Sequence, residues 1–129
     1  MTDFLKKYQP RNFKRGKFKK EKIEEDYIDA IEAIEEGRLV FNKNGVPVYD
    51  LENHLHLDNK DVDTIKKVNF RSRIKQADKA RVLNGIDVEK QQGDYTLNML
   101  SYITQLAVAD ISFLDTHDYN VLQQVSSVF

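Results

Sequence analysis

Two short β-prone runs joined by turn-forming residues constrain the fold of this chain more than any other feature. The runs cover residues 39–41 and 46–49, and the residues between them include Asn44 and Gly45. An Asn-Gly pair tolerates the positive φ angles that a tight antiparallel connection requires. The segment therefore predicts a β-hairpin.

A third β-prone run, residues 62–70, follows after a polar stretch. Together the runs predict a small antiparallel sheet over about residues 39–72. Proline lacks the N–H group that a central strand uses for pairing, so Pro47 indicates an edge strand.

Helical periodicity lies on both sides of the predicted sheet. Before it, apolar residues recur at steps of three and four in the acidic segment 21–37, and they are Ile23, Tyr27, Ile31 and Ile34. After it we expect a helix over residues 74–83, a second from Asp94 as N-cap to about Ala107, and a third from Thr116 onward. The order predicts an α+β fold, in which the sheet is followed by a C-terminal helical bundle.

Charge divides the chain into a basic beginning and an acidic remainder. Residues 1–22 contain nine Lys or Arg and two acidic residues, whereas residues 23–129 contain 11 and 19. Pro10 and Gly16 interrupt helical patterns, so residues 1–20 are predicted to form an extended, flexible basic arm. The acidic helix 21–37 and a single α+β domain over residues 38–129 follow. The cations of the arm are Lys6, Lys7, Arg11, Lys14, Arg15, Lys17, Lys19 and Lys20.

Composition excludes several classes of site. The chain has no Cys, which removes disulfides, thiolate metal sites and cysteine nucleophiles. No apolar run approaches the roughly 20 residues that span a bilayer, and no secretory signal begins the sequence. We therefore expect a soluble, cytoplasmic protein that has no membrane partner.

Catalytic and metal-binding motifs are also missing from the sequence. His54 and His56 share one face of a predicted strand, but no third ligand lies at a recognised spacing. The aspartates at predicted turns and helix starts are expected to cap backbone N–H groups, and they are Asp58, Asp61, Asp63, Asp115 and Asp118. We expect a protein that is not an enzyme and that uses no cofactor and no metal.

The basic arm allows three interpretations. Its cations alternate with aromatic residues, a pattern that can neutralise phosphates while rings stack on unpaired bases. The arm could instead dock on an acidic protein surface, or remain a solvated tail. The acidic segment beside it could neutralise it within one molecule or between two. Because nucleic-acid-binding domains are usually basic over their folded part, nucleic acid is the weaker candidate partner.

The predicted helix 94–107 carries apolar residues around most of its circumference. Such a helix is either buried on several sides or meets a partner protein. The candidate partner-binding residues on it are Leu97, Met99, Leu100, Ile103 and Leu106, and those of the last helix are Leu122, Val125 and Phe129.

Residues 46–129 resemble a known family in the order of their elements. The pattern consists of Val46-Pro47-Val48-Tyr49, a strand ending in Arg71-Ser72-Arg73, a short helix with Asp78, an apolar helix, and a closing Leu-Asp-x-x-Asp-Tyr-x-x-Leu before a valine-rich end. It resembles the small tail assembly chaperones of contractile-tailed phages of the Mu and P2 type. Residues 1–45 and the polar linker 87–93 depart from that pattern.

The resemblance implies a binding function in the cytoplasm of an infected or lysogenic bacterium. Such chaperones coat a long helical tape-measure protein before the tail tube forms, so the implied partners are that protein and the tube protein, and self-association is expected. Arg71 and Arg73 would position the following helix or pair with acids of a neighbouring subunit. The alternatives are a virion structural protein of the tail or baseplate whose basic arm docks on neighbouring subunits, and a nucleic-acid-binding accessory protein.

Overall fold

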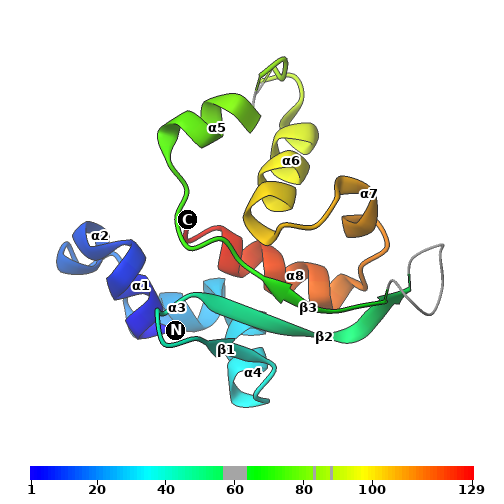
Figure 1. Ribbon diagram of the computed structural model, residues 1–129. Helices are drawn as coiled ribbons and strands as arrows, with labels where there is room; N and C mark the ends of the chain where they lie inside the picture. Colours follow the sequence, from blue (N-terminus) through cyan, green and yellow to red (C-terminus); the bar gives the residue numbers. More distant parts are fainter. Residues whose placement is uncertain (57–63, 83, 88) are drawn as a thin grey trace.

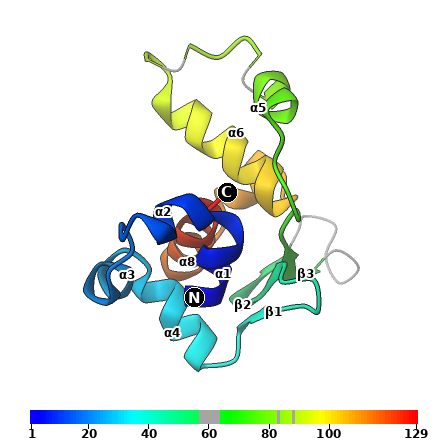
Figure 2. The same cartoon turned by 90° about the vertical axis from the view of Figure 1, so that its left-hand side faces the viewer.

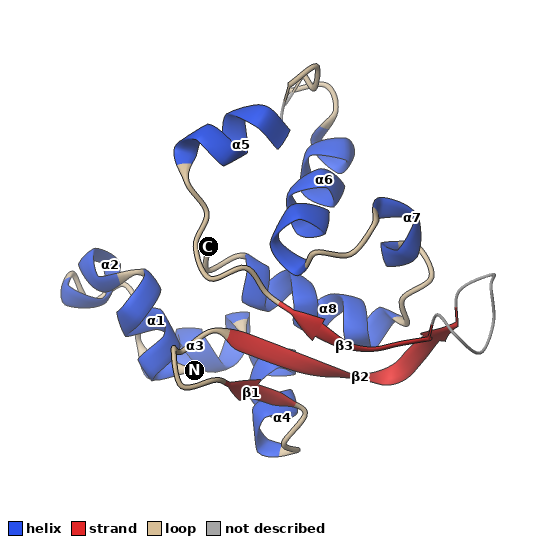
Figure 3. Cartoon of the chain, in the orientation of Figure 1, coloured by secondary structure: helices blue, strands red, loops and turns tan. Residues whose placement is uncertain are grey.

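The computed structural model describes residues 1–56, 64–82, 84–87 and 89–129. These residues form helices and a three-stranded antiparallel sheet, so the predicted α+β class is confirmed (Figures 1 and 3). Among the described helices, none is long and apolar enough to cross a membrane. Outside the described part of the chain lie the predicted turn aspartates Asp58, Asp61 and Asp63 and the side chains of His54 and His56.

The sheet has the order β1 (Leu39–Phe41), β2 (Pro47–His56) and β3 (Thr64–Asn69). Because β2 lies between the other two strands, the prediction that Pro47 marks an edge strand is wrong. Pro47 is the first residue of β2 and lies opposite Phe41. A proline at the start of a strand leaves most of the ladder intact.

The connection between β1 and β2 is the predicted tight turn. The side-chain carbonyl of Asn42 accepts hydrogen bonds from the backbone N–H groups of Asn44 (2.8 Å) and Val46 (3.1 Å). Gly45 has a φ of 76°, a conformation that glycine adopts without steric cost. Turn chemistry close in sequence therefore sets this hairpin.

The first twenty residues do not form the extended arm that we predicted. They contain α1 (Thr2–Tyr8) and α2 (Pro10–Lys14), and Phe4 and Leu5 are buried in the core. Pro10 is the first residue of α2, where the missing proline N–H would have no helical partner in any case. The aromatic residues among the cations thus attach this segment to the rest of the protein.

The acidic segment is divided into α3 (Lys20–Asp26) and α4 (Ile28–Glu35) at Tyr27. Its buried face also differs from the predicted stripe. Ile23, Tyr27, Ala30 and Ala33 are buried, whereas Ile31 and Ile34 are only half-buried. Small side chains let two helices approach closely, and α4 uses them to pack on α8 (Thr116–Ser126).

Three other helices follow the sheet, and they are α5 (Gln76–Val82), α6 (Gln92–Thr104) and α7 (Val108–Ile111). The helix α6 begins before Asp94, which lies in its first turn instead of capping it. It ends where Gln105 adopts a left-handed conformation with a φ of 62°, so it stops short of Ala107. The predicted start of the last helix at Thr116 is confirmed.

The helix α8 lies at the centre of the molecule. It contacts α4, α6 and β2, and the two views place it between the sheet and the upper helices α5 and α6 (Figures 1 and 2). Its residues Val121, Leu122 and Val125 are completely buried. Its buried face therefore includes Val121 in addition to the predicted Leu122 and Val125, whereas Tyr119 is only half-buried.

A buried carboxylate joins α8 to the middle strand. One oxygen of Asp118 accepts hydrogen bonds from the Tyr49 hydroxyl (2.5 Å) and the backbone N–H of Glu52 (2.9 Å), and the other accepts from the N–H of Asn53 (3.0 Å). The β2–β3 register is irregular between Asp50 and Leu55, where a bulge can direct N–H groups away from the ladder. The side chain of Asp118 thus accepts hydrogen bonds from backbone N–H groups of β2 instead of capping the start of α8 as we predicted.

Asp115 also differs from the predicted cap. It occupies the N-cap position of α8, but no side-chain capping bond forms there. Its carboxylate instead accepts a hydrogen bond from the Asn53 side-chain amide (2.6 Å). Both aspartates at the start of α8 are therefore directed to the sheet.

The half-buried Arg38 connects the Tyr49 and Asp118 pair to exposed carboxylates. Arg38 donates to the Tyr49 hydroxyl (3.2 Å) and forms ion pairs with Glu36 (2.7 Å) and Glu52 (3.3 Å). Burial, followed by the hydrogen bond to Asp118, raises the pKa of Tyr49 far above its ordinary value. Tyr49 therefore remains a hydrogen-bond donor to Asp118 throughout the physiological pH range.

We expect Asp118→Asn to lower the free energy of unfolding by about 1–3 kcal/mol. The substitution turns one of the two buried acceptor oxygens into an NH₂ group, which would then face a hydrogen-bond donor of Tyr49, Glu52 or Asn53. Urea denaturation followed by circular dichroism measures the change. The matched control is Asp115→Asn, which alters an exposed carboxylate at the same helix end and should cost less than about 1 kcal/mol. Equal effects of the two substitutions would contradict the role of Asp118.

A candidate partner-binding cleft

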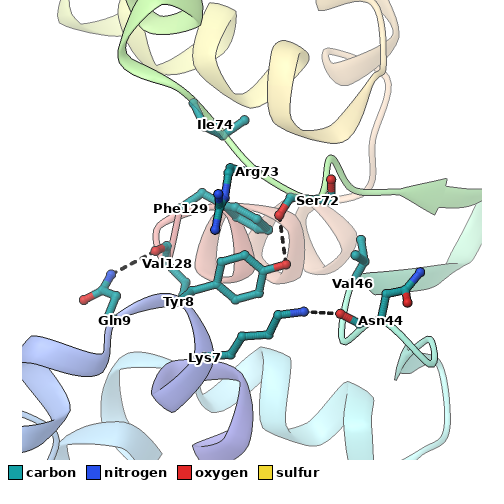
Figure 4. Close-up of a pocket in the computed structure, with 10 residues that line it drawn as sticks. All are labelled: Lys7, Tyr8, Gln9, Asn44, Val46, Ser72, Arg73, Ile74, Val128 and Phe129. Carbon is teal, nitrogen blue, oxygen red and sulfur yellow. Dashed lines mark hydrogen bonds between the residues drawn. The ribbon is translucent and has the colours of Figure 1, made fainter.

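A cleft of about 820 Å³ opens where segments distant in sequence meet. Its walls come from α1, the β1–β2 turn, residues 72–74 after β3, and the last two residues of the chain (Figure 4). The lining residues are Lys7, Tyr8, Gln9, Asn44, Val46, Ser72, Arg73, Ile74, Val128 and Phe129.

Aromatic rings form the wall between α1 and the C-terminal residues. The ring centroids of Tyr8 and Phe129 are 4.8 Å apart, and Figure 4 shows the two rings side by side. Phe4 packs edge-on against both Tyr8 (4.9 Å) and Phe129 (5.8 Å), and Phe70 stacks on Phe129 at 6.3 Å. Such aromatic pairs add stabilisation beyond the area they bury, so α1 is held firmly in place.

Three hydrogen bonds connect α1 to the other walls. The Tyr8 hydroxyl donates to the carbonyl of Ser72 (3.0 Å), and the Gln9 amide donates to the carbonyl of Val128 (2.9 Å). The Lys7 ammonium donates to the carbonyl of Asn44 in the hairpin turn (Figure 4). The shape of the cleft therefore depends on consecutive residues at the end of α1.

The cleft carries positive charge beside its rings. Lys7 and Arg73 are both exposed, and of the ten described residues that line the cleft none is acidic. Burial raises the pKa of Tyr8, and the nearby charge of Arg73 partly opposes that increase. The combination favours a ligand that presents an anionic group next to an apolar one.

Three predicted site residues from different parts of the sequence meet here. Lys7 belongs to the predicted arm, Arg73 to the predicted positioning pair, and Phe129 to the predicted partner-binding stripe. Sequence reasoning missed the other lining residues as members of a site. Tyr8 and Asn44 stood out only as an interleaved aromatic residue and a turn residue, and nothing local connects them.

Most of the predicted partner-binding residues belong to the core instead. Met99, Leu100, Ile103, Leu106, Leu122 and Val125 are buried, and Leu97 is half-buried. The chain itself covers most of the surface of these six side chains, and their role in partner binding stays a prediction. A smaller groove of about 260 Å³ between α6 and α8 reaches Met99, Leu100, Ile103 and Phe129.

Arg71 holds the end of α6. Its Nε donates to the carbonyl of Tyr102 (2.7 Å), and its guanidinium lies 4.1 Å from the centroid of the Tyr102 ring. The backbone N–H of Arg71 donates to the carbonyl of Ile103 (2.9 Å). Arg71 thus positions the end of α6. We predicted that it would position the helix that follows it in the chain, which is α5.

The other predicted arm cations lie outside the cleft and are exposed: Lys6, Arg11, Lys14, Arg15, Lys17, Lys19 and Lys20. Within the described residues, no ion pair joins any of them to an acidic side chain. Nor does this part of the chain group three or more potential ligands for a metal ion.

No family model, curated protein or solved structure matches this chain. The chemistry of the cleft is therefore the main structural guide to function.

Replacing Arg73 by Gln should raise the pKa of Tyr8 further, because the substitution removes the positive charge that favours the phenolate. Titration of the tyrosine ring carbons by NMR measures the change, and Arg81→Gln, at an arginine that faces Tyr102, is the matched control.

The sign of the pH dependence follows from the same shift. A folded-state pKa above the unfolded value of about 10 gives a contribution to stability that is complete below about pH 10. This contribution is lost as pH rises through the folded-state pKa. A Tyr8 pKa that Arg73→Gln leaves unchanged would contradict an electrostatic effect of the Arg73 guanidinium on the Tyr8 phenol.

Proposed function

We propose that this chain is a non-enzymatic phage tail assembly chaperone that binds a long helical, tape-measure-type protein before tube protein assembles around it. The cleft between α1 and the C-terminal residues carries the proposal. It combines the cations Lys7 and Arg73 with the rings of Tyr8 and Phe129. The resemblance of residues 46–129 to such chaperones supports the same function.

The chemistry of the cleft suits an amphipathic helix with acidic residues beside its apolar stripe. Carboxylates on such a helix would pair with Lys7 and Arg73, and its apolar side chains would contact Val46, Ile74 and Phe129. A volume of about 820 Å³ accommodates several side chains of a partner. The helix itself would lie across the opening.

The described lining residues favour binding over catalysis. Ser72 brings a hydroxyl, but among the described lining residues no histidine, aspartate or glutamate side chain is present to act as its base. The donors of Tyr8 and Gln9 are already used to hold the walls together. What remains for a ligand is positive charge and apolar surface.

Weak individual contacts suit a chaperone that must later leave. Lys7 and Arg73 are exposed, so pairs that they form with a partner are screened and individually weak. Many subunits along one long helical protein would nevertheless cover it, since multivalent contacts add up. Covering its apolar stripe would keep the partner soluble until tube protein replaces the chaperone.

Co-expression of this chain with a long helix-rich protein encoded by a neighbouring gene tests the proposal. The expected result is a soluble complex that contains several copies of this chain per partner. Arg73→Glu should lower the amount of co-purified chain at least about tenfold, because it places a like charge against the partner's carboxylates.

The control for this experiment is Lys90→Glu, which makes the same charge change at an exposed position outside the cleft. Co-purification that Arg73→Glu leaves unchanged would contradict a role of the cleft. Stoichiometric copies of the chain in finished particles would instead indicate a virion structural protein.

A further inference from the structure

A second groove, of about 330 Å³, lies between α3, α4 and the start of α1. Its apolar lining includes Ile23, Ile31 and Ile34, and its charged lining comes from the carboxylates of Glu24 and Glu35, the Lys20 ammonium and the N-terminal residue Met1. The chain does not cover Ile31 and Ile34 completely, although they belong to the predicted buried stripe. The groove therefore offers apolar surface, and the segment that forms α3 and α4, residues 20–36, carries eight acidic residues against two lysines.

Acidic side chains continue around this groove on the exposed surface of α3 and α4, and they are Glu21, Glu25, Asp26, Glu32 and Glu36. In the described part of the chain, Asp26 pairs with Lys22 (3.1 Å) and Glu36 with Arg38 (2.7 Å). No other ion pair there neutralises these acids. The surface keeps most of its negative charge.

The α2 segment, residues 10–19, has the complementary chemistry. It exposes Arg11, Lys14, Arg15, Lys17 and Lys19. The half-buried rings of Phe13 and Phe18 lie among these cations, with centroids 6.2 Å apart. Basic and aromatic residues are what an acidic groove with an apolar floor would bind.

The basic segment and the acidic groove do not pair within one molecule. They are neighbours in sequence, yet no ion pair between them is present among the described residues. Of the two ways of neutralising the basic segment that the sequence allows, the structure thus leaves the contact between molecules.

We propose that the α2 segment of one copy of this chain docks in the α3–α4 groove of a second copy. Its cations would face Glu24 and Glu35, and Phe13 would approach the isoleucines of the floor. Because every copy carries both surfaces, two copies can exchange them around a two-fold axis, or more copies can join head to tail. Nucleic acid fits less well, since the adjacent acidic surface repels phosphates.

Such an interface should depend strongly on salt. Exposed charges interact over about 10 Å at 0.1 M ionic strength and over only about 3 Å at 1 M. We expect the dissociation constant for self-association to rise at least about tenfold between 0.05 and 0.5 M NaCl. Sedimentation velocity of the full chain over a concentration series measures it.

Charge reversal identifies the two surfaces. Arg11→Glu with Lys14→Glu reverses the basic segment, and Glu24→Lys with Glu35→Lys reverses the groove. Each double variant alone should be a monomer at 0.05 M NaCl. An equimolar mixture should associate again, because each reversed surface then meets its complement on the other variant.

Lys43→Glu with Lys66→Glu is the control for the basic-segment variant, since it makes the same change in net charge at exposed positions of the sheet and its turn. Circular dichroism establishes that all variants fold. The proposal is overturned if the wild-type chain is a monomer at low salt, if either reversed variant self-associates normally, or if the mixture stays monomeric. Salt-sensitive binding of a 20-nucleotide single-stranded DNA by an otherwise monomeric wild type would assign the basic segment to nucleic acid instead.

Discussion

The buried carboxylate of Asp118 is the interaction on which the arrangement of this fold depends. A buried charge is tolerated only when donors surround it, and Tyr49 with the N–H groups of Glu52 and Asn53 supplies three. These bonds fix the start of α8 on the irregular part of β2. Because α4 and α6 both pack on α8, its placement determines theirs as well.

The cleft follows from the same placement. The residues after α8 carry Phe129 to the ring of Tyr8, so the two ends of the chain form one wall. Residues 1–20, which the sequence predicts as a free arm, direct their aromatic side chains toward the core and expose their cations. Both proposed binding surfaces lie next to this segment, and both would recognise charge beside apolar groups.

The sequence predicted the elements set by local chemistry and missed those set by distant contacts. Asn42, Asn44 and Gly45 specify their turn within a few residues, so the hairpin could be found. The burial of Phe4 depends on Phe41 and Phe129, which no local pattern connects to it. Periodicity located the apolar face of α6, but it could not distinguish a face covered by the same chain from one left for a partner.

Amide hydrogen exchange at Glu52 and Asn53 tests the central role of Asp118 most directly. These N–H groups donate to a side chain at an irregular part of the sheet, so only the Asp118 carboxylate would account for their protection. We predict exchange as slow as that of the central residues of α8, because breaking the hydrogen bonds of these two N–H groups to Asp118 requires α8 to move away from the sheet. Rapid exchange at both residues in an otherwise protected protein would contradict the account.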